Sequence, residues 1–303
     1  MGDINEKIVS GYSKKLISRK YKQELVGKMV ADSDVRSKAV NVHAETVGAS
    51  AASLMPELSE TQIEQIVADI NRSGYGVVEN FLSPQTVSSL QDFISTSVER
   101  GGNQYLGLIG KEAVQSTALE MLSDSPAFNR LMHRVYEFGM KKPAPSQSLY
   151  QVVRCLKGES GLVHSYYFHY DSYIVTALIP IHIPTSGQTG DLVMSLKRRP
   201  FRSSYVRNLV DKVLINNKFT QKMLKGFAIS ETHGFRKVKM IPGNIYFFWG
   251  YNTVHANEPC DINQIRATAL FHFGDPYTNV GLRKITGRAQ IRAEAAAEAA
   301  VEA

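Results

Sequence analysis

Three side chains in this sequence have the types and the order of a metal site: His169 and Asp171, two positions apart, and His255 much later in the chain. Two imidazoles and one carboxylate are the ligands of the facial triad that holds non-haem ferrous iron and leaves coordination positions open for substrate and oxygen. Side chains alternate along a β-strand, so residues 169 and 171 of a strand would point to one face and could hold one ion. The sequence therefore predicts a metal centre formed by His169, Asp171 and His255.

Arg266 follows His255 by eleven residues and has the apolar neighbours Ile265 and Ala267 in a strand-like stretch. A buried arginine is costly unless an anion accompanies it. A guanidinium also binds a carboxylate through two parallel hydrogen bonds. We therefore expect Arg266 to bind the carboxylate of a small molecule close to the metal.

Two other sets of residues have a similar spacing. His43 and Glu45 lie in a polar N-terminal segment without a strand pattern, so we do not assign them to the metal. His272 is followed by Arg283 after eleven residues, but the turn signal Asp275-Pro276 ends the strand before that arginine. The first set of residues is therefore preferred.

The elements that must position these residues are helices first and strands later. Cap and proline signals, with apolar residues at helical spacing, predict helices at 59–71, 84–100 and 126–139, with loop and helix at 101–125. Further along, the apolar period of two is typical of strands. The expected strands cover residues 148–156, 163–171, 173–183, 190–196, 235–240, 244–249 and 264–273. This order indicates an α+β chain with a double-stranded β-helix core of the jelly-roll or cupin-like kind.

Three stretches resemble the iron(II)/2-oxoglutarate-dependent dioxygenases, and their phytanoyl-CoA-hydroxylase-like branch more than the prolyl-hydroxylase branch. Residues 74–98 begin with Gly-Tyr-Gly-Val-Val-Glu-Asn-Phe-Leu-Ser-Pro and continue as an amphipathic run. Residues 166–184 carry His169 and Asp171, and residues 242–273 carry Pro-Gly-Asn, His255 and Arg266. The resemblance covers about residues 60–280.

The resemblance implies Fe(II), 2-oxoglutarate and O2 at this site. Arg266 would bind the distal carboxylate of 2-oxoglutarate, whose oxidative decarboxylation to succinate would be coupled to hydroxylation of a substrate C–H bond. Further candidate contacts to 2-oxoglutarate are polar strand residues: Thr268, Tyr150 and Thr176, with Gln151 and Arg154 also considered. Candidates for binding the substrate are Arg198, Arg199, Arg202 and Asn257.

Composition places the chain among globular proteins, since 43% of its 303 residues are hydrophobic and 21% are charged. No apolar run reaches the eighteen residues of a membrane span, and the N-terminus does not resemble a secretory signal. The two cysteines, Cys155 and Cys260, are expected to be reduced thiols. These features predict a cytoplasmic protein, with peripheral contact at the inner membrane surface as an option.

The net charge of +7 is concentrated in one segment, because residues 195–225 contain nine Lys and Arg residues and a single acid, Asp211. A solvated helix face is one interpretation. The other is a surface for anions: a small-molecule, glycan or lipid-linked anionic substrate, such as a sugar acid of the Kdo class, or an anionic membrane surface. Nucleic acid is disfavoured because no nucleic-acid-binding motif accompanies the charge.

We expect three regions: an N-terminal helical or irregular extension at 1–58, a dioxygenase domain at 59–285 with a basic helical insertion at about 197–226, and an Ala/Glu-rich tail at 286–303. Two alternative functions stay open. One is a cupin-like metalloenzyme that does not use 2-oxoglutarate, and the other is a catalytically inactive binding module of the same fold. Arg266 favours the dioxygenase over the first, and the complete triad favours it over the second.

Overall fold

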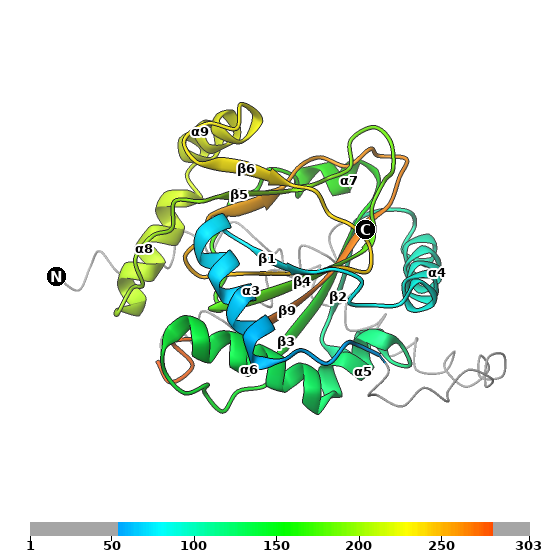
Figure 1. The fold of residues 1–303 in the computed structure, drawn as a ribbon. Helices are drawn as coiled ribbons and strands as arrows, with labels where there is room; N and C mark the ends of the chain where they lie inside the picture. Colours follow the sequence, from blue (N-terminus) through cyan, green and yellow to red (C-terminus); the bar gives the residue numbers. More distant parts are fainter. Residues whose placement is uncertain (1–53, 281–303) are drawn as a thin grey trace, which may run out of the picture. The chain divides into compact units, whose positions relative to one another are not determined.

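Two antiparallel sheets form the centre of the protein in its structure, a computed structural model that describes residues 54–280. The larger sheet has the strand order β1-β7-β4-β9-β3-β2, and the smaller has the order β6-β5-β8. The strands are β1 (Gly76–Val78), β2 (Leu106–Ile109), β3 (Tyr150–Leu156), β4 (Val175–His182), β5 (Leu192–Ser195), β6 (Phe235–Val238), β7 (Ile245–Phe248), β8 (His255–Asn257) and β9 (Arg266–Phe273). Strands distant in sequence are neighbours in both sheets, and this crossing order confirms the double-stranded β-helix (Figure 1).

Strand alternation divides each long strand between two environments. On β9, Ala267, Ala269, Phe271 and Phe273 belong to the large core that the helices share. The alternate residues Arg266, Thr268, Leu270 and His272 face the space between the sheets, where Leu270 packs against apolar side chains of β4, β5, β6 and β7. Polar side chains at alternate positions of β9 are therefore directed into the interior of the fold.

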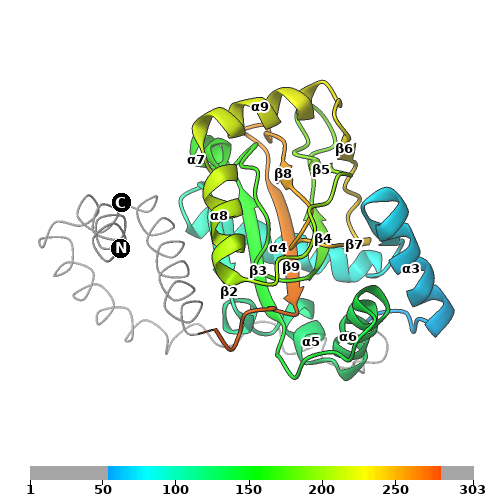
Figure 2. The ribbon, with the colours of Figure 1, turned by 90° about the vertical axis from the view of Figure 1, so that its left-hand side faces the viewer.

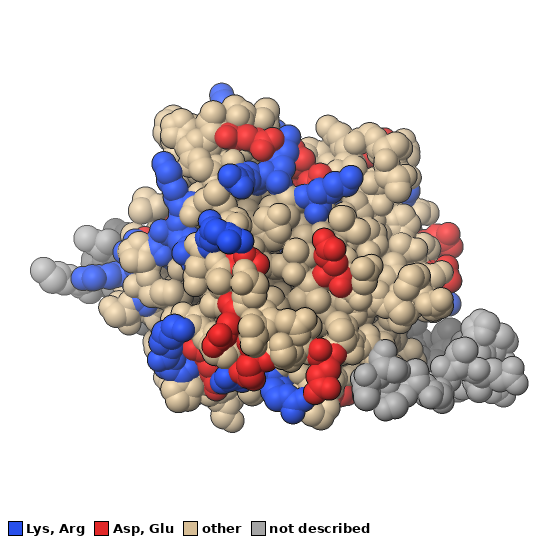
Figure 3. Space-filling view, in the orientation of Figure 1, with Lys and Arg blue, Asp and Glu red and all other residues tan. Residues whose placement is uncertain are grey.

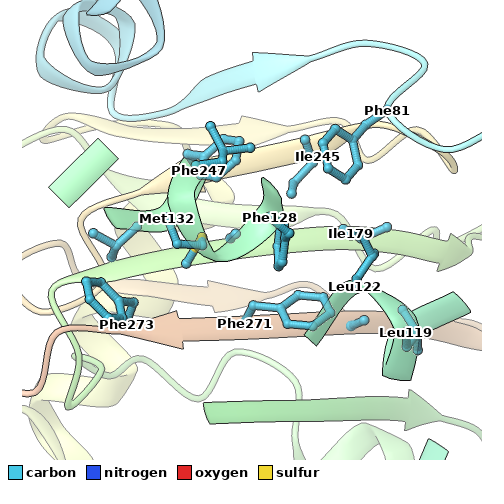
Figure 4. Close-up of a cluster of buried hydrophobic side chains, with 14 of the residues drawn as sticks. Phe81, Leu119, Leu122, Phe128, Met132, Ile179, Ile245, Phe247, Phe271 and Phe273 are labelled. Atoms are coloured by element: carbon cyan, nitrogen blue, oxygen red, sulfur yellow. The ribbon is translucent and has the colours of Figure 1, made fainter. Parts of the chain in front are cut away.

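Helices cover the outer face of the larger sheet. They are α3 (Glu60–Ser73), α4 (Pro84–Arg100), α5 (Ala118–Asp124) and α6 (Pro126–Met140). Ser59 forms a capping box with Gln62 at the start of α3, and Ser83 caps α4 with Pro84 in its first turn. In Figure 4, Phe128 of α6 lies against Phe271 of β9, with ring centroids 4.9 Å apart. The three helices predicted at 59–71, 84–100 and 126–139 are therefore confirmed.

The basic segment forms two helices between β5 and β6, as predicted: α8 (Tyr205–Ile215) and α9 (Lys218–Ile229). Short helical turns occur at Lys111–Val114 and at α7 (Gly158–Val163). No helix within residues 54–280 is long and apolar enough to cross a membrane. Residues 1–53 and 281–303, and with them His43, Glu45 and Arg283, lie outside the described residues, so the predicted region boundaries stay predictions.

One expected strand is wrong. Residues 163–171 contain the end of α7, a turn with Tyr166 at φ 52°, and only an isolated bridge between His169 and His255. The many aromatic side chains of residues 163–171 favour a strand locally. The backbone of this segment instead bonds to a side chain and to single residues elsewhere in the fold, as described below. Strands β2 and β8 were not predicted, because each has only four or three residues and no clear period of two.

Candidate metal centre

His169, Asp171 and His255 converge at one point in the fold. Nε2 of His169 lies 3.6 Å from Oδ1 of Asp171, and Nε2 of His255 lies 3.5 Å from the same oxygen. The three donor atoms all lie within 4.8 Å of one another. Asp171 and His255 are nearly buried, whereas 29% of the His169 side chain is exposed, so the group opens to solvent on the side of His169.

The hydrogen bonds of both imidazoles to the backbone engage Nδ1 and leave Nε2 as the nitrogen that can bind a metal. Nδ1 of His169 lies 2.9 Å from the carbonyl oxygen of Tyr167, and Nδ1 of His255 lies 3.0 Å from that of Thr253. A carbonyl oxygen only accepts, so each Nδ1 must carry a hydrogen, and each Nε2 is left as the nitrogen that can bind a metal. Such outer contacts fix the tautomer and the ring orientation of metal-binding histidines.

The second carboxylate oxygen of Asp171 is held by a short relay. The hydroxyl of Thr176 donates to Oδ2 of Asp171 at 2.5 Å, and Nδ1 of His272 lies 3.0 Å from the same hydroxyl. Burial would favour the neutral carboxyl, but His255, by its charge and its hydrogen bond, holds the pKa of Asp171 well below its usual range. Burial also lowers the pKa of His272 to about 4, so this ring is neutral and donates to Thr176. Thr176 and His272 therefore orient the ligand Asp171.

Gly250 makes room for this carboxylate. A Cβ atom at position 250 would stand 2.0 Å from Oδ2 of Asp171 and 2.4 Å from Oγ1 of Thr176. Its carbonyl oxygen also accepts a hydrogen bond of 2.9 Å from the backbone of Asp171. Only glycine fits here, although nothing in the sequence around Gly250 indicated this.

The segment that carries His169 and Asp171 is held from both sides without belonging to a regular strand. On one side, His169 and His255 exchange two backbone hydrogen bonds of 3.1 and 3.2 Å. On the other, the side-chain amide of Gln221 in α9 accepts from the backbone of Phe168 at 3.0 Å and donates to its carbonyl at 2.7 Å. One glutamine thus replaces the neighbouring strand that a sheet would supply.

We predict that Gln221→Leu weakens metal binding by about tenfold to a hundredfold, the usual cost of losing a group that orients a metal ligand. The substitution removes both bonds to Phe168 and frees the turn that aims His169. The measurement is the affinity for Mn(II), followed by electron paramagnetic resonance. Gln91→Leu is the matched control, because Gln91 donates one hydrogen bond to Ile181 from α4. Equal affinities in the two variants would contradict the role of Gln221.

Arg266 is buried among neutral partners. Its Nε donates to the carbonyl of Gly190 at 2.6 Å, and a terminal nitrogen lies 3.4 Å from Oγ1 of Thr268. Among residues 54–280 the guanidinium forms no ion pair, and burial lowers its pKa to about 10, which still leaves it charged at neutral pH. Gly190, at φ +71°, lets the arginine pass, because a Cβ there would stand 2.5 Å from Cδ of Arg266. A charged group is thus positioned with only neutral hydrogen-bond partners among the described residues.

Arg154 brings a second positive charge to the interior. It lies on β3 opposite Thr268 of β9, in the register that also pairs Leu156 with Arg266. Its charge adds to the effect of burial in lowering the pKa values of Arg266 and His272. Arg154 and Arg266 therefore both act on the polar interior that β3 and β9 share.

The other predicted contacts have different surroundings. Thr268 touches Arg266, and Thr176 touches the ligand Asp171. The ring of Tyr150 stacks on His272, with centroids 6.0 Å apart, and on Tyr173 at 5.5 Å. Gln151 points the other way and bonds to Ser123 near the helices. Thr268 thus lies beside Arg266, whereas Thr176 lies at the carboxylate of Asp171 and Tyr150 adjoins His272, so their predicted contacts to 2-oxoglutarate stay predictions.

The residues expected to bind substrate are mostly engaged elsewhere. Arg198 bonds to the backbone and side chain of Asn71 at the end of α3. Arg199 is buried, stacks on Tyr170 at 4.0 Å and bonds to Asn208 and Asp211, and Arg202 shares Asp211. The side-chain amide of Asn257 donates to the carbonyl of Glu258 at 2.9 Å. The structure brings none of these four side chains into the group around Asp171.

No family model and no curated protein sequence matches the chain. Solved structures do match at low identity. A prolyl 4-hydroxylase from Phytophthora capsici is 12% identical with a TM-score of 0.48, over 80% of this chain and 71% of the other. A Trichoplax adhaerens prolyl hydroxylase in complex with a hypoxia inducible factor peptide is 14% identical with a TM-score of 0.47, over 72% and 90%. The epimerase SnoN, in complex with Fe3+, alpha ketoglutarate and nogalamycin RO, is 14% identical with a TM-score of 0.44, over 71% and 85%.

Proposed function

We propose that this protein is an Fe(II)- and 2-oxoglutarate-dependent hydroxylase. The observation that carries the proposal is the pairing of two sites in one interior. One is a set of two imidazoles and one carboxylate with the Nε2 atoms free, and the other is a buried, charged Arg266 with only neutral hydrogen-bond partners among the described residues. A redox metal with open coordination positions would bind the first site, and an anionic co-substrate would pair with the arginine of the second.

The donor set fits a ferrous ion. His169, His255 and Asp171 supply two neutral nitrogens and one anionic oxygen on one side, which suits an octahedral metal that keeps other positions open. When bound, the iron would supply the activation of dioxygen that 2-oxoglutarate decarboxylation and C–H hydroxylation require. The presence of Asp171 as a complete carboxylate ligand supports hydroxylation rather than halogenation.

The chain's own groups would orient the co-substrate. We assign the distal carboxylate of 2-oxoglutarate to Arg266, with the hydroxyl of Thr268 beside it. The positive charge of Arg154 would further favour a dianion in this interior and help to release it from water. Thr176 and His272 hold the carboxylate of Asp171 in one orientation, so the metal would bind without rearrangement of the site.

We also propose that the substrate is anionic, since the basic segment 195–225 keeps the exposed lysines Lys218, Lys222 and Lys225 on α9. Sugar acids such as Kdo, or other small or lipid-linked anions, are the class to examine first. His169 is the most exposed of the three proposed ligands, and Tyr167 two residues before it bonds to Asn216 at the end of α8, so we assign the approach of the substrate to this side.

The test of the reaction class is an anaerobic titration of the full chain with Fe(II) and 2-oxoglutarate. Chelation of the metal by the keto acid gives a weak visible charge-transfer band, which we expect with both reagents and with neither alone. Removing iron with a chelator should abolish it. Absence of the band in the intact protein would refute the proposal. Succinate release on addition of oxygen, compared across anionic glycans, acyl thioesters and amino-acid derivatives, would then identify the substrate.

A further inference from the structure

Helix α8 is amphipathic with its apolar side turned outward. Val206, Leu209, Val210, Val213 and Leu214 recur at the spacing of a single helical stripe, and all five are exposed. The opposite side of the helix carries most of its inward polar groups, with Asn208 and Ile215 buried and Asp211 and Lys212 half-buried. An ordinary surface helix has the reverse arrangement.

Specific polar contacts fix this orientation. Asn208 accepts from Arg199 at 2.6 Å, Asp211 is bound by both Arg199 and Arg202, and Lys212 donates to Ser172 at 2.9 Å. Rotation of α8 to bury its apolar stripe would break each of these bonds and bury charge without partners. The outward stripe is therefore a stable property of the fold.

Helix α9 extends the same kind of surface. Phe219 is 76% exposed, and Met223 and Ile229 are exposed too. Lys218, Lys222 and Lys225 are interspersed with them. Asp211, the single acid of residues 195–225, is already neutralised by two arginines, so the lysines give this surface a positive charge. Figure 3 shows Lys and Arg side chains gathered at the upper left, where Figure 1 places α8, α9 and β6.

We infer that the outer face of α8 and α9 binds the surface of a lipid bilayer that contains anionic phospholipid. Apolar side chains that enter the boundary between headgroups and acyl chains, with lysines beside anionic headgroups, are how amphipathic helices bind such surfaces. A second copy of this chain would bring the same positive face against itself. Residues 1–53 also do not complement it, since they contain nine Lys and Arg residues against six Asp and Glu.

The same two helices support the metal centre from their inner side. Gln221 holds the backbone of Phe168, Lys212 bonds to Ser172, and Asn216 accepts from the hydroxyl of Tyr167 at 3.2 Å. All three contacts fall within three residues of His169 or Asp171. Figure 2 shows α8 and α9 from the side that this surface would present to the membrane. Binding there would bring the open side of the centre close to the lipid headgroups.

The experiment is flotation of the full chain with vesicles of phosphatidylcholine and phosphatidylglycerol in equal parts, and with vesicles of phosphatidylcholine alone. We expect binding to the mixed vesicles only, and its decline as salt is added. K218Q/K222Q/K225Q should weaken binding by about a hundredfold. V213E/F219E should weaken it by at least about tenfold, since two exposed apolar side chains are replaced by acids.

Matched controls change the same residue types elsewhere. R130Q/K141Q/K142Q removes three exposed cations at α6, and I241E/I262E replaces two exposed isoleucines outside α8 and α9. Both should bind as the unmodified chain does, and circular dichroism should show every variant folded. Failure to bind mixed vesicles, equal binding to neutral vesicles, or unchanged binding by the α8–α9 variants would overturn the inference. So would self-association of the chain that V213E/F219E abolishes. The inference does not rest on the proposed function, because the metal and 2-oxoglutarate titration is independent of lipid.

Discussion

His255→Ala should eliminate specific binding of Fe(II), with a loss greater than the tenfold to hundredfold that follows removal of a supporting residue. The substitution removes one of the two nitrogens that lie 3.5 and 3.6 Å from Oδ1 of Asp171. What remains is one imidazole and one carboxylate, a set that protein surfaces offer commonly and that holds ferrous iron weakly. The backbone bonds between residues 255 and 169 do not depend on the side chain, so the fold should persist.

The matched comparison is His272→Ala, in which another buried imidazole beside Asp171 is removed. Nδ1 of His272 lies 3.8 Å from Oδ2 of Asp171 and bonds to Thr176, so its role is to orient the ligand. We expect a loss within the tenfold to hundredfold range, and a retained visible band at high iron and 2-oxoglutarate. Titration of both variants with Fe(II) and 2-oxoglutarate, without oxygen, decides the matter. Complete loss of the band in His272→Ala, with retention in His255→Ala, would reverse the assignment.

Much of this site followed from the sequence because the helices and long strands have strong local signals. Ser59 with Gln62, and Ser83 with Pro84, satisfy unpaired groups at helix starts and so mark those starts in any fold. The strand containing Arg266 has polar residues at three of its four alternate positions, Arg266, Thr268 and His272, with alanine and phenylalanine on the other face. Local chemistry and tertiary structure agree at these positions, so prediction succeeds.

The segment with His169 and Asp171 was predicted less well, although its ligands converge as the site required. Its backbone bonds run to Gln221, 53 residues away from Phe168, and to Gly250 and His255. The residues around His169 contain no pattern from which Gln221 of α9 could have been predicted as their backbone partner. The same reason explains Gly250 and Gly190, whose importance depends on the side chains of Asp171 and Arg266 that pass beside them. Distant packing, not propensity, decides these positions.

Arg198, Arg199 and Arg202 show that a charge run does not by itself identify which cations are available to a substrate. Asp211 lies nine residues after Arg202 and captures both Arg199 and Arg202, and Asn71 captures Arg198. Charge counting along the sequence does not distinguish cations that are paired within the fold from those that are exposed. Within residues 195–225, the exposed lysines of α9 are the cations that could interact with another molecule.

Arg266→Leu should weaken 2-oxoglutarate binding by about a hundredfold or more while Fe(II) affinity changes little. Removing one member of a buried charge pair costs about 2–5 kcal/mol, and each 1.4 kcal/mol is a factor of ten. Gly190→Ala should act in the same direction, because its Cβ would stand 2.5 Å from Cδ of Arg266 and displace the guanidinium. Arg198→Leu is the matched control, since Arg198 bonds to Asn71 outside the metal centre. The measurement is the 2-oxoglutarate concentration that gives half of the visible band.

Thermal stability distinguishes this reading of Arg266 from a metalloenzyme that does not use 2-oxoglutarate. A buried guanidinium with neutral partners is a cost to the folded protein, so leucine at this position should leave the melting temperature of the ligand-free protein unchanged or raise it. A ligand that binds only the folded state raises that temperature, so adding 2-oxoglutarate to the Fe(II)-loaded protein should further stabilise the unmodified chain and add little stability to Fe(II)-loaded Arg266→Leu. If Arg266 were instead a structural cation, its replacement would lower the melting temperature and 2-oxoglutarate would stabilise neither protein. Two measurements therefore test whether Arg266 binds a carboxylate: the direction in which Arg266→Leu changes the melting temperature, and the stabilisation of the unmodified chain by 2-oxoglutarate.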